Sequence, residues 1–391
     1  MPITRQAVIL VGGLGTRLGS LTNNTPKPLL KVGEFAFLSY LIDTLARHGF
    51  NDILLLAGFQ GDAVSAFAES RSRSGLGVRC VVENMPLGTG GALRNARNYL
   101  ADDFILLNGD TLFDINLNDL AVPPLLDAFA RMALRRVGET SRFGRIVLVC
   151  ENVVAMQEKG IDGEGLINGG IYFLAKACLD FLPIGTSSLE KDLFPRLIAD
   201  RRIHGREYTG FFLDIGVPDD FETAQVSIPK NQIRSAVFLD RDGVLNENTN
   251  YVSRPEEVIW IEGAKEGVKK LNDAGYYVFV ITNQAGVARG YYDEVQVQIL
   301  HEWMQEELRE AGAHVDKFYY CPHHPEFTGI CDCRKPKPGM IIQAIGEWPI
   351  NINGSFLIGD QKSDVAAAHN FGIPGYIFSS GNLSDFISKI I

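Results

Sequence analysis

The chain has 391 residues, of which 46% are hydrophobic and 21% are charged, and its formal net charge is −10. This length predicts two or three domains, and the composition is typical of a globular protein with a substantial core. The acidic balance excludes general nucleic-acid binding, which needs a basic surface, but it is compatible with a locally positive pocket for small anions.

The N-terminal segment "MPITRQAVILVGG" contains only a short apolar run before its glycines. Such a run is too short for a signal peptide or a membrane span. We therefore expect a cytoplasmic protein with no nucleic-acid and no membrane partner. In that compartment its six cysteines would be thiols or metal ligands rather than disulfides.

Short runs rich in branched residues alternate with helix-like runs along the chain. The predicted strands are residues 7–11, 52–58, 78–84, 104–110, 236–245, 276–284 and 354–360, and residues 37–50 have helical spacing. This alternation predicts an α/β fold made of two doubly wound, mostly parallel sheets. The polar stretch 225–235 separates the halves, so we place the domains at 1–228 and 235–391.

The segment "LVGGLGTRL" (10–18) directly follows the first strand. Its glycines would let backbone N–H groups approach a phosphate, and a helix N-terminus favours anions. It is neither a dinucleotide fingerprint, which needs glycine at Leu18, nor a Walker loop. Arg17 and Lys27 add two cations, which suits a nucleoside triphosphate. The simpler alternative is a glycine turn with surface charges.

Two strand ends and a second glycine-rich loop accompany this segment. The loop "ENMPLGTGGAL" (83–93) suits close contact with a base or ribose. Asp110 and Asp214 follow apolar runs, and open α/β sheets bind ligands at such strand ends. Two carboxylates can hold one Mg²⁺ against phosphate oxygens, although a lone aspartate is more often a turn or cap residue.

Residues 5–225 resemble the sugar-1-phosphate nucleotidyltransferases, whose motif G-G-x-G-T-R-L…P-K-P-L appears at positions 12–18 and 26–29. The resemblance implies that a sugar phosphate attacks the α-phosphate of a nucleoside triphosphate and that pyrophosphate leaves. It implies that Arg17 and Lys27 neutralise the triphosphate and that Asp110 and Asp214 bind Mg²⁺. The nucleotide-binding residues it implies are Gly12, Gly13, Gly15, Thr16, Glu83, Gly88 and Thr89. The sugar-phosphate residues it implies are Glu158, Lys159, Asn168 and Gly169, the last where alanine is usual.

The second half contains an ordered set of acidic and basic residues. Asp240 and Asp242 in "FLDRDGVLN" start from one face of a strand end, and such a pair suits a nucleophile and a general acid/base around Mg²⁺. Further along the chain come Thr282 and Asn283, which could donate hydrogen bonds to a phosphoryl group. Lys335 follows in "RKP", and Asp360 and Asp364 follow in "GDQKSD".

Residues 235–391 resemble the haloacid-dehalogenase phosphatases. The resemblance implies that Asp240 forms an aspartyl-phosphate and that Asp242 protonates the leaving oxygen and then activates water. It also implies that Thr282 holds the phosphoryl oxygens and that Lys335 steadies the nucleophile. The Mg²⁺ ligands it implies are Asp240, Asp360 and the backbone carbonyl of Asp242. The motifs leave no room for a large cap domain.

Cys321, His323, Cys331 and Cys333 have the composition of a closed tetrahedral zinc site, which predicts structural Zn²⁺ that orders the loop carrying Arg334 and Lys335. His324 is an alternative ligand, and free buried thiols are the simpler alternative. The same arrangement marks the histidinol-phosphate and heptose-bisphosphate branch of these phosphatases, which implies substrate contacts from Arg289 and Arg334. The isolated cysteines Cys80, Cys150 and Cys178 are expected to be buried apolar residues.

The two halves together suggest consecutive reactions. The first half looks most like heptose 1-phosphate guanylyltransferases, and a phosphatase acting on a heptose 1,7-bisphosphate would supply their substrate. We therefore expect a bifunctional enzyme of GDP-heptose synthesis that uses sugar phosphates, GTP, Mg²⁺ and Zn²⁺. The alternatives are a mannose or other hexose 1-phosphate nucleotidyltransferase fused to a histidinol-phosphate-like phosphatase, or a non-catalytic nucleotide-sugar-binding regulator. The sequence leaves a homo-oligomer open.

Overall fold

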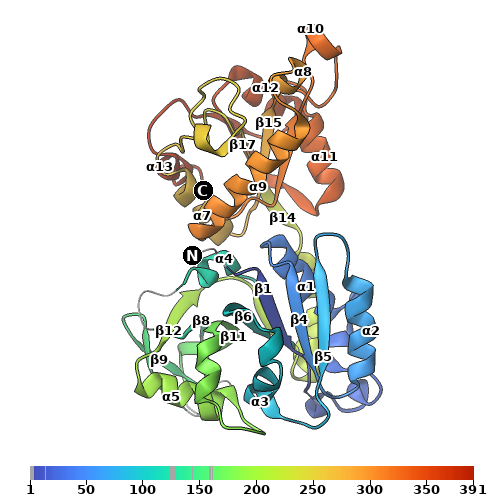
Figure 1. The fold of residues 1–391 in the computed structure, drawn as a ribbon, viewed down its shortest axis with the longest axis vertical. Helices are drawn as coiled ribbons and strands as arrows, with labels where there is room; N and C mark the ends of the chain where they lie inside the picture. Colours follow the sequence, from blue (N-terminus) through green and yellow to red (C-terminus); the bar gives the residue numbers. More distant parts are fainter. Residues whose placement is uncertain (1–3, 14, 124–127, 143, 158–159, 161) are drawn as a thin grey trace. The chain divides into compact units, whose positions relative to one another are not determined.

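The computed structural model describes residues 4–391 except 14, 124–127, 143, 158–159 and 161. The chain divides into two compact units, the first ending at Lys230 and the second beginning at Asn231. We call them the N-terminal unit and the C-terminal unit (Figure 1). Among the described helices, none has both the length and the apolar character that crossing a membrane requires.

The N-terminal unit is built on a nine-stranded sheet in the order β5-β4-β1-β6-β11-β8-β12-β10-β9. These strands are β1 (Gln6–Leu10), β4 (Asp52–Ala57), β5 (Gly77–Val82), β6 (Asp103–Asn108), β8 (Ala130–Val137), β9 (Ile146–Val149), β10 (Asn152–Met156), β11 (Gly165–Ala175) and β12 (Ile203–Tyr208). Two smaller pairs are β2 (Lys31–Val32) with β3 (Phe35–Ala36), and β7 (Thr111–Phe113) with β13 (Phe212–Asp214).

Helices cover both faces of this sheet because β1 is apolar on both sides. Ala7 and Ile9 belong to one core, and Val8 belongs to the other. The α-helices of this unit are α1 (Phe37–Arg47), α2 (Gly61–Arg71), α3 (Gly88–Asn95), α4 (Leu117–Ala121), α5 (Phe194–Ala199) and α6 (Pro218–Asn231). The short helical turns are η1 (Thr16–Thr22), η2 (Lys27–Leu29), η3 (Arg97–Tyr99), η4 (Lys176–Phe181) and η5 (Leu189–Leu193).

The sheet of the N-terminal unit is mixed, which differs from the mostly parallel sheet that we expected. Strands β5, β4, β1 and β6 are parallel, but β11 pairs antiparallel with both β6 and β8. β11 is irregular between Asn168 and Tyr172, where Gly170 has a φ of 75°. The parallel half still brings the ends of β1, β5 and β6 to one edge, where α/β sheets bind ligands.

The stretch expected to be a polar linker is helix and strand. Residues 225–231 complete α6, and β14 begins at Arg234. The reason is tertiary packing against the β2–β3 hairpin: the Gln225 side chain accepts a hydrogen bond from Gly33 N and donates one to Lys31 O, each at 3.0 Å. Gln225, a polar residue of α6, therefore attaches this helix to the β2–β3 hairpin.

The C-terminal unit has a fully parallel sheet in the order β16-β15-β14-β17-β18. Its strands are β14 (Arg234–Leu239), β15 (Tyr277–Asn283), β16 (Lys317–Cys321), β17 (Ile350–Gly359) and β18 (Gly375–Ile377). Its helices are η6 (Pro255–Glu257), α7 (Ala264–Asp273), α8 (Ala285–Ala288), α9 (Glu294–Glu310), α10 (Pro325–Thr328), α11 (Gly339–Glu347), α12 (Lys362–Phe371) and α13 (Leu383–Ile387).

Alternate residues of β14 again face two cores. Val237 and Leu239 pack with α7 and α9, whereas Ala236 and Phe238 pack with α11 and α12. Because all the strands are parallel, the residues that follow β14, β15 and β17 meet at one edge. The unit is therefore doubly wound, as predicted.

The isolated cysteines differ in burial. Cys178 is buried as expected and Cys80 is half-buried, but Cys150 is exposed. The prediction was wrong for Cys150 because this residue stands in the turn between β9 and β10 with a φ of 55°.

Candidate active sites

A buried lysine and two aspartates form the main charge cluster of the N-terminal unit. Lys27 is only 6% exposed, and its Nζ lies 2.7 Å from Asp110 Oδ2 and 4.0 Å from Asp214 Oδ1. The β7–β13 pairing sets Asp214 opposite Thr111, so the two aspartates come together across that pair. Burial raises the pKa of Asp214, Asp110 raises it further, and Lys27 opposes the shift. Two carboxylates held this close fit a divalent cation.

The first glycine loop is shaped by one strained position. Gly15 has a φ of 63°, and a Cβ there would lie 2.9 Å from Thr22 Cγ2, so glycine is required. Gly13 has open space where its Cβ would be, and Thr16 and Arg17 are exposed. The Arg17 charge lies close enough to lower the pKa of Asp214. The loop therefore leaves open space at Gly13 and places a cation near Asp214.

In the second glycine-rich loop (83–93), Glu83 lies near the first loop, whereas Gly88 and Thr89 contact residues 187–189. Glu83 Oε1 lies 3.3 Å from the Cβ position of Gly12, and burial raises the pKa of Glu83. Thr89, by contrast, accepts a hydrogen bond from Leu189 N at 2.9 Å, and a Cβ on Gly88 would lie 2.5 Å from Ser187 O. Gly88 and Thr89 thus fasten the N-terminus of α3 to residues 187–189.

The predicted sugar-binding strand is β11. The Asn168 side chain donates to Tyr172 OH at 2.7 Å and accepts from Gly170 N at 2.9 Å, so it also holds the irregular part of the strand. A Cβ on Gly169 would lie 2.5 Å from Phe113 Cδ1, so Phe113 occupies the space that an alanine would need. Glu158 and Lys159 lie outside the described residues.

In the C-terminal unit, Lys335 ties two aspartates together. Lys335 Nζ lies 2.9 Å from Asp240 Oδ1 and 2.7 Å from Asp364 Oδ1, and it donates to Ile281 O at 2.8 Å. Asp240 follows β14, whereas Asp364 lies in the first turn of α12. Burial raises the pKa of Asp240 to about 7, Lys335 opposes the shift, and Asp364 adds to it. A bound cation would favour the ionised nucleophile.

Asp360 completes the acidic cluster at the end of β17. One carboxylate oxygen each from Asp240, Asp360 and Asp364 lie within 4.8 Å of one another. Within the described part of the chain, Asp360 Oδ1 is buried without a hydrogen-bond partner, which fits a metal ligand. Sequence reasoning placed Asp364 in the motif but gave it no role, since its pairing with Lys335 depends on how α12 begins.

The Asp242 side chain is turned toward other partners. Its carboxylate accepts from Arg241, from Asn246 Nδ2 at 3.0 Å and from Gln284 Nε2 at 3.1 Å. It therefore does not join the acidic cluster, which leaves only its backbone carbonyl as the expected metal ligand. Asp240, Asp242, Thr282, Arg334, Lys335 and Asp360 line one cavity of about 320 Å³.

Thr282, Asn283 and Arg289 are the remaining predicted residues of this site, and they differ in what they contact. Thr282 and Asn283 both line the cavity, but the Asn283 side chain bonds both main-chain groups of Lys335, at 3.1 and 3.2 Å. Arg289 stacks on the Phe327 ring, with its guanidinium carbon 4.7 Å from the ring centroid. Asn283 thus positions Lys335, and Arg289 packs against α10.

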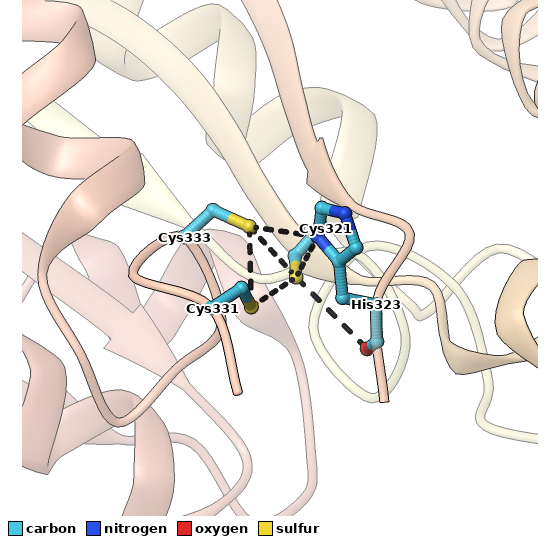
Figure 2. Close-up of side chains that lie close together, drawn as sticks. All are labelled: Cys321, His323, Cys331 and Cys333. Carbon is cyan, nitrogen blue, oxygen red and sulfur yellow. Dashed lines mark hydrogen bonds between the residues drawn. The ribbon is translucent and has the colours of Figure 1, made fainter. Parts of the chain in front are cut away.

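The four predicted zinc ligands converge (Figure 2). Cys321 Sγ lies 3.6 Å from Cys331 Sγ, and Cys333 Sγ lies 3.5 Å from Cys331 Sγ and 3.3 Å from His323 Nδ1. Tetrahedral zinc–sulfur bonds place sulfurs roughly 3.8 Å apart. The third sulfur pair, Cys321 and Cys333, is tighter at 3.0 Å, so the fit to Zn²⁺ rests on the donor types and their convergence. His324 lies outside the set and caps α10 through its ring nitrogen. Arg334 donates to His323 O at 3.0 Å, which links the cluster to the cavity.

Comparison with known proteins agrees with this geometry. Residues 6–231 match the nucleotidyl transferase family, and residues 332–385 match the HAD-hydrolase-like family. The chain belongs to the nucleotidyl transferase family. Its C-terminal unit belongs to the HAD-type phosphatases, since it is 47% identical over 163 residues to a D-glycero-beta-D-manno-heptose-1,7-bisphosphate 7-phosphatase of Rhodopseudomonas palustris, covering 40% of this chain and 91% of that protein.

Two further similarities concern the nucleotidyltransferase unit. It is 33% identical over 223 residues to a D-glycero-alpha-D-manno-heptose 1-phosphate guanylyltransferase of Aneurinibacillus thermoaerophilus, covering 56% of this chain and 96% of that protein. It also resembles the crystal structure of HddC from Yersinia pseudotuberculosis complexed with GMP-PN, with 31% identity and a TM-score of 0.51, covering 58% of this chain and all of that one. Both resemblances drawn from the motifs are thus confirmed, and the chain is an enzyme with a nucleotidyltransferase and a phosphatase activity.

Proposed function

We propose that this chain converts a D-glycero-D-manno-heptose 1,7-bisphosphate into GDP-heptose in two steps. The observation that carries the proposal is the pairing of relatives within one chain: one is named as a heptose-1,7-bisphosphate 7-phosphatase and the other as a heptose 1-phosphate guanylyltransferase. Removing the 7-phosphate from the bisphosphate leaves heptose 1-phosphate, which is the sugar substrate of the second reaction.

In the phosphatase step Asp240 is the nucleophile. Its Oδ1 is held by Lys335 and by the backbone N–H of Arg241 at 2.7 Å, which leaves Oδ2 to form the bond to phosphorus. The bond from phosphorus to the sugar oxygen breaks, and that oxygen takes a proton from Asp242. Asp242 then removes a proton from the water that attacks the aspartyl-phosphate, so inorganic phosphate leaves and Asp240 is regenerated.

Asp240, Asp360 and the carbonyl of Asp242 would hold Mg²⁺, which neutralises charge on the transferred phosphoryl group. The orphaned Asp360 Oδ1 supports this assignment. Asp364 instead keeps Lys335 in place. The Cys₃His cluster would hold one structural Zn²⁺, because four protein ligands leave no open position for water. Such thiolates suit a reducing compartment, so we place the reaction in the cytoplasm.

In the transferase step a phosphate oxygen of heptose 1-phosphate attacks the α-phosphorus of GTP. A new P–O bond forms, the bond to the β-phosphate oxygen breaks, and pyrophosphate leaves. Arg17 and Lys27 would neutralise the triphosphate, and Asp110 and Asp214 would hold Mg²⁺. The guanine preference rests on the guanylyltransferase relative and on the GMP-PN bound to HddC. Lys159 and Glu158 are proposed to bind the sugar phosphate.

The anomer is proposed to be α. The guanylyltransferase relative is named for the α form, whereas phosphatase relatives at 47% and 45% identity are named for β and α respectively. A single chain must pass one anomer between its two sites, so we assign to both units the anomer for which the guanylyltransferase relative is named.

A substrate panel tests the proposal. The purified chain with Mg²⁺ should release phosphate from the α heptose 1,7-bisphosphate faster than from the β form, from hexose bisphosphates or from histidinol phosphate. It should then release pyrophosphate with heptose 1-phosphate and GTP faster than with mannose 1-phosphate or with the other triphosphates. Preference for mannose 1-phosphate or histidinol phosphate would support the alternative pairing, and no turnover of any substrate would support a regulator.

A further inference from the structure

Gln284 connects the general acid/base to the rest of the phosphatase site. Its Nε2 donates to Asp242 Oδ2 at 3.1 Å and to Thr282 Oγ1 at 2.8 Å. Gln284 is only 2% exposed, so the surrounding atoms restrict the conformations of its side-chain amide. One side chain therefore spans a proton-transfer residue and a phosphoryl-binding residue.

Tyr292 determines which way this amide points. Its hydroxyl donates to Gln284 Oε1 at 2.7 Å, and Arg241 also donates to that oxygen at 3.3 Å. With the carbonyl oxygen fixed by two donors, the NH₂ group must face Asp242 and Thr282. Burial raises the pKa of Tyr292 to about 12, which keeps the hydroxyl protonated and able to donate.

The backbone makes room for this tyrosine. A Cβ on Gly286 would lie 2.3 Å from Tyr292 Cε1, so any larger residue at position 286 would push the ring away. Tyr292 itself is 7% exposed and follows α8, the helix that begins just after Gln284. The two partners of this hydrogen bond thus flank the short helix α8.

Arg241 contacts the same carboxylate oxygen as Gln284. It is 1% exposed, its guanidinium lies 2.9 Å from Asp242 Oδ2, and it donates to Val252 O at 2.8 Å. Its NH1 lies 3.4 Å from His301 Nε2, and burial with the nearby Arg241 charge holds the pKa of His301 well below its usual value. A neutral His301 can accept from the guanidinium and does not repel it.

We propose that Tyr292, acting through Gln284, is a positioning residue that aims the Asp242 carboxylate for both proton transfers of the phosphatase reaction. The inference rests on the proposed roles of Asp240 and Asp242, but not on the identity of the sugar. In the first transfer the proton passes from Asp242 to the leaving sugar oxygen, and in the second it passes from the attacking water to Asp242. Neither Gln284 nor Tyr292 gains or loses a proton.

The test compares leaving groups, because a good leaving group needs no proton in the first step. Tyr292→Phe and Gln284→Met are compared with wild type in stopped flow with p-nitrophenyl phosphate and Mg²⁺. We expect the variants to release p-nitrophenolate in a burst of one per chain at nearly the wild-type rate. A slower steady state should follow, because hydrolysis of the aspartyl-phosphate still needs Asp242 as a base.

On the heptose bisphosphate we expect kcat to fall by a factor of roughly 10–100 with KM unchanged, within the contribution of general acid–base catalysis.

The control is Tyr319→Phe, which removes another buried tyrosine hydroxyl, one that donates to Glu347 at 2.8 Å. It should match wild type in both assays. The proposal is overturned if burst and steady state slow by the same factor in Tyr292→Phe, if only KM rises, or if nothing changes. Should wild type turn over p-nitrophenyl phosphate but not the heptose bisphosphate, the proposed substrate fails while the burst comparison still tests Tyr292.

Discussion

Lys335 holds one carboxylate oxygen of Asp240, the residue that follows β14. It is 2% exposed in its side chain and touches Asp240 and Asp364 at once. Burial lowers the pKa of Lys335, but the two aspartates raise it by more, so the lysine stays charged. Its charge offsets part of the repulsion among three nearby carboxylates.

Lys335→Met should therefore destabilise the C-terminal unit by about 3–5 kcal/mol, because it leaves buried aspartates without a cation. Phosphate release should be lost as well. Thermal unfolding should show the loss most strongly in EDTA, and added Mg²⁺ should restore part of it by compensating Asp240 and Asp360. The control Lys337→Met removes an exposed ion pair with Asp332 and should leave the transition unchanged. An unfolding temperature equal to wild type in EDTA would contradict this account.

A second prediction at the residue scale concerns Gly169. Gly169→Ala should cost about 1–3 kcal/mol in the N-terminal unit, because the new methyl group would overlap Phe113 and Ala133 O. Gly138→Ala is the matched control, since no heavy atom lies within 4 Å of its Cβ position. Equal unfolding temperatures for the two variants would show that Phe113 moves aside freely. Phosphate release should be normal in both.

At the scale of elements, the loop between β16 and α11 carries the four side chains proposed to bind Zn²⁺. Within residues 321–335 the structure describes only the short helix α10, and the cluster ties the loop's two ends together. Arg334, which lines the cavity, donates a hydrogen bond to the carbonyl of His323. Ordering of the cluster would therefore also fix the position of Arg334. We expect the proposed Zn²⁺ to stabilise a loop with so little regular structure.

Cys331→Ser should reduce zinc from about one ion per chain to far less and lower phosphate release, because three remaining ligands hold the metal weakly. Nucleotidyl transfer should stay at the wild-type level. Elemental analysis and the two activity assays measure these effects. Cys150→Ser, which changes an exposed cysteine in a turn, should keep both zinc and activity. Wild-type protein without zinc after metal-replete expression would refute the assignment.

At the scale of the whole chain, each unit has its own cluster of a buried lysine and two aspartates, around Lys27 in the first and Lys335 in the second. Asp110→Asn should cut pyrophosphate release by orders of magnitude, since it removes one of two carboxylates from the proposed Mg²⁺ site. Phosphate release from the bisphosphate should stay close to wild type. Asp102→Asn, in the same unit, is the control. If Asp110→Asn transfers normally, Asp110 is a strand-end residue without a metal role.

The sequence predicted what depends on strand ends and spacing. Asp240, Thr282 and Asp360 meet because parallel strands end at one edge, and the zinc ligands meet because their spacing is short. Tertiary packing, which local patterns do not encode, determines three further features. These are the antiparallel pairing of β11, the hydrogen bonds of Gln225 to the β2–β3 hairpin and those of Asn283 to the Lys335 backbone. Arg241 lies inside the "FLDRDGVLN" motif and Gln284 directly follows Asn283, but the sequence does not reveal their burial or their contacts with Asp242.

The order of the two reactions is the central claim, and Asp240→Asn tests it most directly. This variant keeps side-chain size but cannot form an aspartyl-phosphate. Incubated with the heptose 1,7-bisphosphate, GTP and Mg²⁺ and analysed by mass spectrometry, it should make no GDP-heptose, whereas with heptose 1-phosphate it should match wild type. A GDP-linked heptose phosphate formed from the bisphosphate as fast as GDP-heptose forms from the monophosphate would contradict the account, because nucleotidyl transfer would then precede dephosphorylation.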